Sequence, residues 1–227
     1  MKPKFVALML GWLIVGIFHS NGQGLFQKGD WTIRFHPLGL LDVDAGINAG
    51  VGYRFSPRWT VIGEAGYLFL DPYQRLGYGE NLRGWKWRQE IRYHTNHFLF
   101  GIRRTFHALD LMYKQVQYRK ETTVGVNCIQ GNCAYYRLVN YKEIKKEWAM
   151  ALKGGFELPL SRNGGPVSLE LYAGLGVKFL QFKEKGIPEN TTRVSGTDDE
   201  RLPWESEGIP SPYLPGGIKI VYKLSVR

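Results

Sequence analysis

The chain has 227 residues and a formal net charge of +10, from 30 Lys and Arg against 20 Asp and Glu. A hydrophobic content of 44% and a charged content of 22% exclude wholesale disorder. Two cysteines exclude a disulfide-dense scaffold and a four-cysteine zinc site. The basic charge leaves nucleic acid and an anionic membrane as the partner classes to be distinguished.

The N-terminal segment has the three parts of a secretory signal peptide. Two lysines give a positive start, residues 5–18 form an apolar run, and small residues follow up to Gly22. The apolar run is shorter than the roughly 18 residues that a membrane-spanning helix needs. We therefore predict a signal peptide at 1–22 and export of residues 23–227, which argues against a nucleic-acid partner.

Apolar and polar residues alternate along the exported part with the period of two that is typical of β-strands. In residues 84–94, Trp85, Trp87 and Ile91 share one face, and the residues between them are mostly charged. The alternation predicts eight strands, near 30–36, 43–56, 58–70, 84–95, 97–118, 136–159, 167–183 and 216–227. In the fifth strand we expect a bulge near Arg103 to shift the phase.

The connections between these strands differ in length in a regular way. Tight turns are expected at Ser56–Pro57–Arg58, Thr95–Asn96 and 161–166, and long loops at 71–83, 119–135 and 184–215, after a shorter first loop at 37–42. All the tight turns then fall on one side, which is typical of outer-membrane barrels. We predict an all-β fold, an eight-stranded antiparallel transmembrane β-barrel with up-and-down order. A soluble barrel or sandwich is the alternative.

In a membrane barrel the apolar face points to lipid and the charged face points into the lumen. The expected aromatic girdles are Tyr53, Phe55, Trp59, Tyr93 and Phe98 at one rim and Tyr67, Phe69, Trp85 and Trp87 at the other. Eight strands enclose only their own side chains, so we expect the lumen charges to pair into a plug. The predicted lumen charge network is Arg34, Arg54, Glu64, Lys86, Arg88, Glu90, Arg92, Arg103, Glu147, Lys153, Glu157, Glu170, Lys178, Lys219 and Lys223.

Bases outnumber acids in this network, so we expect some of them to reach a rim, hold ordered water or bind an anion. Glycines within the strands are expected to give room for long Arg and Lys side chains. Basic residues near the outer strand ends, at 118–120 and 142–146, either contact lipopolysaccharide phosphates or are solvated.

Two segments resemble a known family. They are AGINAGVGYRFSPRWTVIGEAGYLF at 45–69, with its strand–SPxW–strand hairpin, and the closing GGIKIVYKLSV at 216–226. They are similar to the small eight-stranded outer-membrane barrel superfamily that includes the OmpA barrel domain and OmpX. The resemblance covers roughly residues 28–227. It implies an outer-membrane structural or adhesion-type role and supplies no catalytic residues.

Two further residue pairs are candidates for chemistry. Cys128 and Cys133 lie in the third long loop, and export favours a local disulfide between them over two free thiols. His107 is expected on the outer half of the fifth strand, with Glu147 near it, but no serine is clearly placed beside them for a catalytic triad. Histidines in a lumen are more often hydrogen-bonded plug residues. We predict no cofactor and no metal.

The sequence therefore predicts a non-enzymatic protein of the Gram-negative outer membrane. Its expected role is structural, adhesive or partner-binding, through extracellular loops at 119–135 and 184–215. The expected partners are outer-membrane lipid, lipopolysaccharide and an extracellular or envelope protein. The alternative is a lipid A-modifying enzyme of deacylase or acyltransferase type. A small-solute channel is disfavoured because an eight-stranded barrel is narrow.

Overall fold

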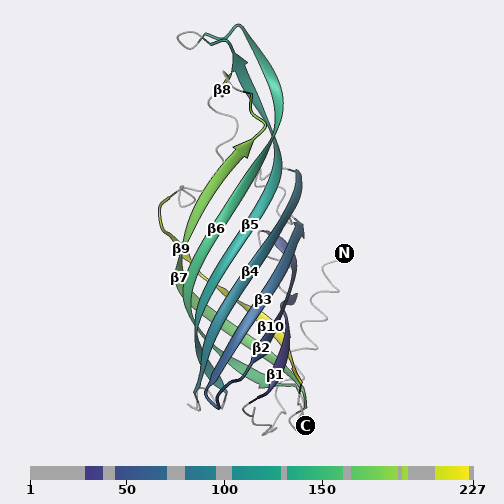
Figure 1. Cartoon of the computed structure of the whole chain (residues 1–227), viewed down its shortest axis with the longest axis vertical. Coiled ribbons are helices and arrows are strands. Elements are labelled where there is room, and N and C mark those ends of the chain that lie inside the picture. The colour runs from purple at the N-terminus through teal and green to yellow at the C-terminus, as the bar shows by residue number, and fades with distance from the viewer. Residues whose placement is uncertain are drawn as a thin grey trace, which may run out of the picture.

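A computed structural model describes residues 29–37, 44–70, 80–95, 104–128, 132–160, 165–188, 191–193 and 208–224. They form an all-β fold in which ten strands belong to one antiparallel sheet (Figure 1). The predicted signal peptide at 1–22 lies outside the described residues. Within those ranges, no helix is both long and apolar enough to cross a membrane.

Eight of the strands close into a hydrogen-bonded ring. They are β1 (Trp31–Phe35), β2 (Ala45–Tyr53), β3 (Trp59–Leu70), β4 (Glu80–Thr95), β5 (Thr105–Val126), β6 (Tyr135–Pro159), β7 (Val167–Lys185) and β10 (Gly216–Leu224). Each pairs with its neighbour in the ring, and β10 pairs with both β7 and β1. The predicted all-β antiparallel order is confirmed as a ring of eight strands.

Two short strands flank this ring. β8 (Thr191–Arg193) pairs with the far end of β5, and β9 (Ser211–Tyr213) pairs with β7. The predicted long loop at 184–215 therefore contains two strand segments, both of which pair with the sheet.

β9 continues β10 in the same register. Tyr213 pairs with Gly176, and Gly216 pairs with Ala173, so the spacing is the same on both strands. Pro215 stands between the two segments, where it has no backbone N–H to donate to the ladder. The last strand of the ring starts at Gly216, as predicted, and β9 precedes it in line along the same edge of β7.

The ring strands are strongly tilted. Trp31 pairs with Leu224 at the end of β10. Following register partners from Trp31 across β2, β3, β4, β5 and β6 leads to Leu175 on β7. The β7 partner of Gly216, at the start of β10, is Ala173, two positions before Leu175. A row of register partners that starts at one end of β10 therefore returns, after one circuit of the ring, at the other end of β10. A closed sheet with such a stagger has inclined strands, as Figure 1 shows.

The connection between β4 and β5 is longer than predicted. Thr95 pairs with Thr105, so residues 96–104 lie between the two strands and the tight turn predicted there is wrong. Arg103 and the first part of the strand predicted at 97–118 lie outside the described residues.

The other two predicted turns differ in how much of them the structure describes. Ser56 and Trp59 exchange backbone hydrogen bonds of 3.2 and 3.4 Å, so the turn at 56–58 is present. Of the turn predicted at 161–166, residues 161–164 lie outside the described ranges.

The loop predicted at 119–135 is mostly strand. β5 and β6 remain paired as far as Val126 and Tyr135, and Figure 1 shows this hairpin protruding beyond the rest of the ring. The segment 119–126 is rich in Thr and charged residues and shows little apolar alternation, which is why the sequence predicted a loop.

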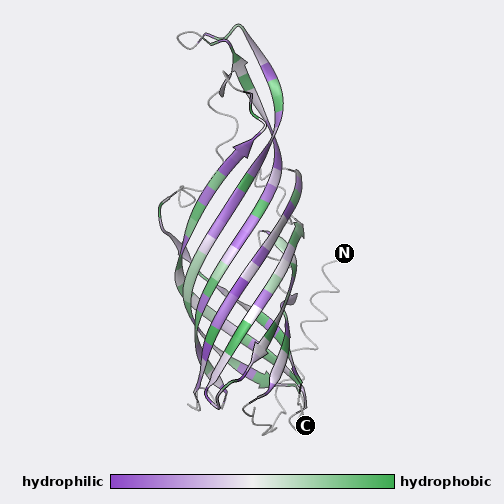
Figure 2. Ribbon diagram, in the orientation of Figure 1, coloured by the Kyte–Doolittle hydropathy of each residue, from purple (hydrophilic) through white to green (hydrophobic). Residues whose placement is uncertain are grey.

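The two faces of the ring differ in chemistry, and Figure 2 shows hydrophilic and hydrophobic residues alternating along the strands. The outward face is apolar, and Leu152 on β6 and its register partner Leu175 on β7 are each 71% exposed. The exposed aromatic residues on this face include Trp31, Phe55, Trp59, Tyr67, Phe69, Trp85, Trp87, Trp148 and Phe179. The residues between them point inward, and many are buried and charged.

Candidate functional site in the ring interior

Charged side chains are concentrated in the interior of the ring. Among the described residues, the buried carboxylates are Asp30, Asp44, Glu64, Glu90, Asp110, Glu143, Glu147, Glu157 and Glu170. The buried bases are Arg34, Arg54, Lys86, Arg88, Arg92, Lys145, Lys153 and Lys219. The buried acids and bases are thus nearly equal in number, and further lysines are less deeply buried. Isolated buried charges are very costly, so this arrangement depends on pairing.

Arg92 on β4 is the centre of one cluster. Its guanidinium donates hydrogen bonds of 2.7 and 2.8 Å to Glu170 on β7 and a further bond of 3.4 Å to Glu157 on β6. It also donates to Glu90 on its own strand. The planar guanidinium suits this two-pronged contact with a carboxylate, which is among the strongest side-chain pairings.

Arg34 on β1 brings a second guanidinium to the same carboxylates. It donates to Glu170 and lies 3.9 Å from Glu157. Arg54, which follows β2, is buried nearby and donates to the Thr60 hydroxyl at 3.4 Å. These contacts join β1, β4, β6 and β7 across the interior.

Lys153 on β6 links this cluster to the next. Its ammonium lies 2.6 Å from Glu90 and 3.1 Å from Asp110. The same ammonium and that of Lys219 each lie 4.9 Å from the centre of the Tyr172 ring, where the aromatic face favours a cation.

Arg88 occupies the middle of the interior. It lies 3.4 Å from Asp110 and 3.8 Å from Glu64, and it donates a 2.9 Å hydrogen bond to the Tyr213 hydroxyl on β9. Lys219 on β10 also donates to Glu64. Glu64 is therefore shared between two cations from different strands.

A third cluster lies near the base of the protruding hairpin. Lys114 on β5 pairs with Asp44 and with Glu147, each at 2.8 Å. Burial raises the pKa of Asp44, but attraction by Lys114 and Lys145 and a hydrogen bond from Tyr118 outweigh it and lower the pKa to about 2. Asp44 therefore stays ionised at neutral pH.

Small residues make room for these side chains. A Cβ on Gly66 would lie 1.9 Å from the Asn48 Oδ1, and a Cβ on Gly174 would lie 2.8 Å from the Lys153 Cγ. Any larger residue at these two positions would displace an interior polar side chain, as expected for glycines in strands beside bulky neighbours.

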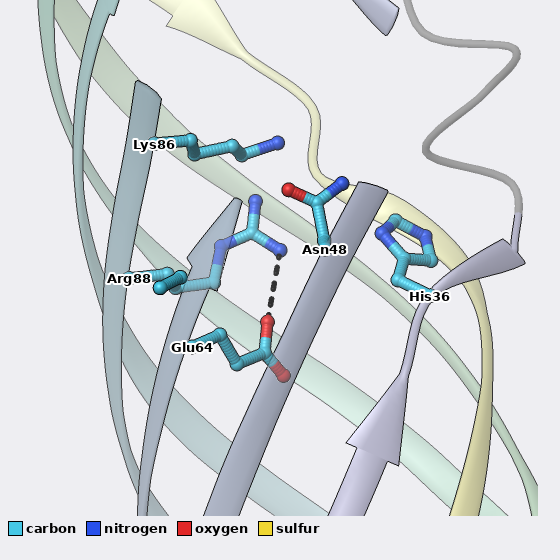
Figure 3. A pocket seen from close by; sticks show the side chains of 6 residues that line it. His36, Asn48, Glu64, Lys86 and Arg88 are labelled. Carbon is cyan, nitrogen blue, oxygen red and sulfur yellow. Dashed lines mark ion pairs between the residues drawn. The ribbon is translucent and has the colours of Figure 1, made fainter. Parts of the chain in front are cut away.

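A small pocket opens among the interior charges (Figure 3). Its lining residues are His36, Asn48, Glu64, Ala65, Lys86 and Arg88, and the space among them is about the size of one water molecule. These residues come from the end of β1 and from β2, β3 and β4. The pocket is thus built by four consecutive strands of the ring.

The remaining residues of the predicted network lie at lesser depth or outside the described ranges. Lys178 is half-buried on β7, and Lys223 pairs with Asp30 at 2.9 Å near the ring end. Arg103 lies outside the described residues. Asp110 and Lys114 were absent from the predicted network, because the expected bulge near Arg103 left open which face of the fifth strand points inward.

The structure does not bring His107 and Glu147 together. His107 is exposed on the outward face of β5, opposite Tyr93 and Gly154, near the β4–β5 connection. Glu147 pairs with Lys114, seven positions farther along β5 and on the inward face. The expected position of His107 near this acid is therefore wrong.

Cys128 and Cys133 form a disulfide at the tip of the β5–β6 hairpin, so this prediction is confirmed. Gly125 lies directly beneath it, since a Cβ there would meet the Cys133 Sγ at 2.2 Å. The disulfide therefore closes the tip of the hairpin locally, at a distance from the ring.

Comparison with family models, curated proteins and solved structures finds no match for this chain. The geometry of the ring and its interior is therefore the basis for assigning a function.

Proposed function

We propose that this protein is a non-enzymatic β-barrel of the outer membrane that presents the β5–β6 hairpin to a partner outside the cell. The observation that carries the proposal is the inverted distribution of polarity: an apolar exposed face surrounds a buried charged interior. A soluble ring would place its apolar side chains inside, because burial of apolar surface is the main driving force for folding in water.

The spacing of the outward aromatic residues supports a membrane environment. On β3, Trp59 and Tyr67 are eight positions apart, and their register partners on β4 are Tyr93 and Trp85. At about 3.3 Å per residue and a tilt of about 40°, eight positions span roughly 20 Å in height. This is close to the roughly 25 Å apolar band between the aromatic girdles of outer-membrane barrels.

The packed interior supports a structural role over conduction. The clusters around Arg92, Arg88 and Lys114 connect strands across the ring with ion pairs, and an eight-stranded barrel has room only for its own side chains. Such an interior acts as a plug that holds the barrel wall in place.

The β5–β6 hairpin is the surface that best suits a partner. Tyr135, Tyr136 and Leu138 are all exposed, and Arg137 adds a positive charge between them. In the described part of the chain, β6 pairs from Tyr135 to Tyr141 only with β5, so its other edge carries no strand. An exposed sheet edge with apolar side chains can accept an extended segment of another protein.

Fractionation of cells tests the location. We expect the protein in the outer-membrane fraction, migrating faster on gels before heating than after. Recovery as a soluble periplasmic monomer would contradict the proposal. Protease added to intact cells should cut the hairpin and leave a protected fragment that contains the ring strands.

A pull-down from envelope extracts and from extracellular proteins tests the partner role. The folded protein should capture a protein that the variant Tyr135→Ser/Tyr136→Ser/Leu138→Ser does not capture. The control is Leu214→Ser, an exposed residue away from the hairpin, which should behave like the wild type. Equal capture by all three proteins would exclude the hairpin as the binding surface.

A further inference from the structure

The pocket in Figure 3 is lined by a histidine whose ring nitrogens form no hydrogen bond with the described part of the chain. His36 is 8% exposed, and both of its ring nitrogens are buried without a hydrogen-bond partner. A neutral imidazole carries one N–H donor and one acceptor, and buried polar groups in proteins are nearly always hydrogen-bonded. The ring therefore has one donor and one acceptor available to a ligand in the pocket.

The position of His36 is fixed by close packing. The ring lies beside Gly217, where a Cβ would be 2.7 Å from the Nε2, and beside Tyr172, whose ring centre is 6.2 Å away. The His36 backbone N–H donates to the Asn48 carbonyl at 3.1 Å. The backbone of residue 36 is thus fixed to β2, and its ring lies between Gly217 and Tyr172.

The charges that face the pocket favour an anion. Lys86 and Arg88 are two positions apart on β4, so both project into the interior on the same face. Asn48 adds a side-chain amide. The one carboxylate in the lining, Glu64, already receives a hydrogen bond from Lys219 and lies 3.8 Å from Arg88. A cation placed here would meet two positive side chains, whereas an anion would meet N–H donors.

The size of the pocket limits the ligand. The space among the lining atoms holds about one water-sized particle. A halide ion is only slightly larger than a water molecule, whereas phosphate or a lipid headgroup is much larger. Donors from β1, β2 and β4 converge on it, so the site belongs to the folded ring and to no single strand.

We infer that this pocket binds one halide-sized monovalent anion, such as chloride, through N–H groups of His36, Asn48, Lys86 and Arg88. The anion accepts the hydrogen bond of the imidazole N–H and lies beside the N–H groups of the two basic side chains. The inference does not depend on the location of the protein, because the site is internal to the ring.

Bromide is the probe for this site, because its anomalous X-ray scattering distinguishes it from water. Crystals of the folded protein grown in sodium bromide should show an anomalous peak between His36, Asn48 and Lys86. Ordinary density without an anomalous signal would mean an ordered water only, and would overturn the inference.

Thermal unfolding of the same protein measures binding in solution. Chloride should raise the melting temperature relative to gluconate at equal ionic strength, with a saturating dependence on concentration. Lys86→Gln should raise the half-saturating chloride concentration about tenfold, a loss of about 1.4 kcal/mol in binding free energy. His36→Phe, which removes the imidazole donor, is the second variant, for use if Lys86→Gln does not fold.

Lys178→Gln is the matched control, because Lys178 is a half-buried lysine on β7 that does not line the pocket. It should keep the wild-type response to chloride. Equal responses to chloride and gluconate in the wild type, or an equal loss of response in Lys178→Gln, would overturn the inference.

Discussion

Arg92 and Glu170 meet across the interior of the ring through two hydrogen bonds of 2.7 and 2.8 Å. They are 78 residues apart in the sequence, and β5 and β6 separate their strands within the sheet. Both side chains are 0% exposed. This pair therefore connects β4 and β7, which are not adjacent in the ring, and neither side chain is accessible to water.

Removing one member of this pair should be strongly destabilising. We expect Arg92→Met to lower the free energy of unfolding by about 3–5 kcal/mol, because Glu170 and Glu90 then lose their shared cation inside the ring. The double variant Arg92→Met/Glu170→Met should cost less than the sum of the single variants, since it leaves fewer unpaired charges. Urea-induced unfolding followed by tryptophan fluorescence measures these differences.

Lys223→Gln is the control for this series. Its ion pair with Asp30 lies near the ring end and is more accessible to water than the Arg92 pairs, so Lys223→Gln should cost less than Arg92→Met. If Arg92→Met is no more destabilising than Lys223→Gln, the interior pairs do not hold the ring together.

The alternation of side chains was sufficient to predict the number and order of the ring strands, because it follows from the geometry of a single strand. It did not predict where pairing starts and stops. β5 begins at Thr105 and reaches Val126, and these limits depend on what β4 and β6 offer as partners. The protruding hairpin was missed for this reason.

Contacts across the interior could not be predicted either. Which carboxylate faces Arg92 depends on the stagger of the closed ring, which is set only when β10 pairs with β1. The inward position of Asp110 could have been predicted from the sequence, because Leu109 and Leu111 flank it on the opposite face. The expected bulge near Arg103 left the phase of that strand open.

Two glycines on β3 give a matched test of the crowded interior. Gly66→Ala should cost about 1–3 kcal/mol, because the new methyl group would lie 1.9 Å from the Asn48 Oδ1. Gly63→Ala meets nothing within 4 Å and should be neutral or slightly stabilising, since it restricts the unfolded chain. The measurement is the urea midpoint of each variant. Equal midpoints would contradict the close packing around Asn48.

The disulfide should stabilise the hairpin tip and leave the ring unchanged. Loop-closure entropy gives about 2 kcal/mol for a short loop such as Cys128–Cys133, and this applies to local opening of the tip. Cys128→Ser/Cys133→Ser should be cleaved faster by protease in the hairpin. Its midpoint for unfolding of the ring should match the wild type, and a large shift would show that the tip and the ring unfold together.

An arginine scan of the exposed leucines distinguishes a membrane face from a solvated one. Leu152 lies on the outward face of the ring at 71% exposure, and Leu138 lies on the protruding hairpin at 62%. If the ring spans a bilayer, Leu152→Arg should make folding into lipid vesicles less favourable by about 2–4 kcal/mol, because the arginine is buried in hydrocarbon. Leu138→Arg should change it by less than about 0.5 kcal/mol, since the hairpin stays in water. Two equally small effects would place Leu152 in water and contradict a transmembrane ring.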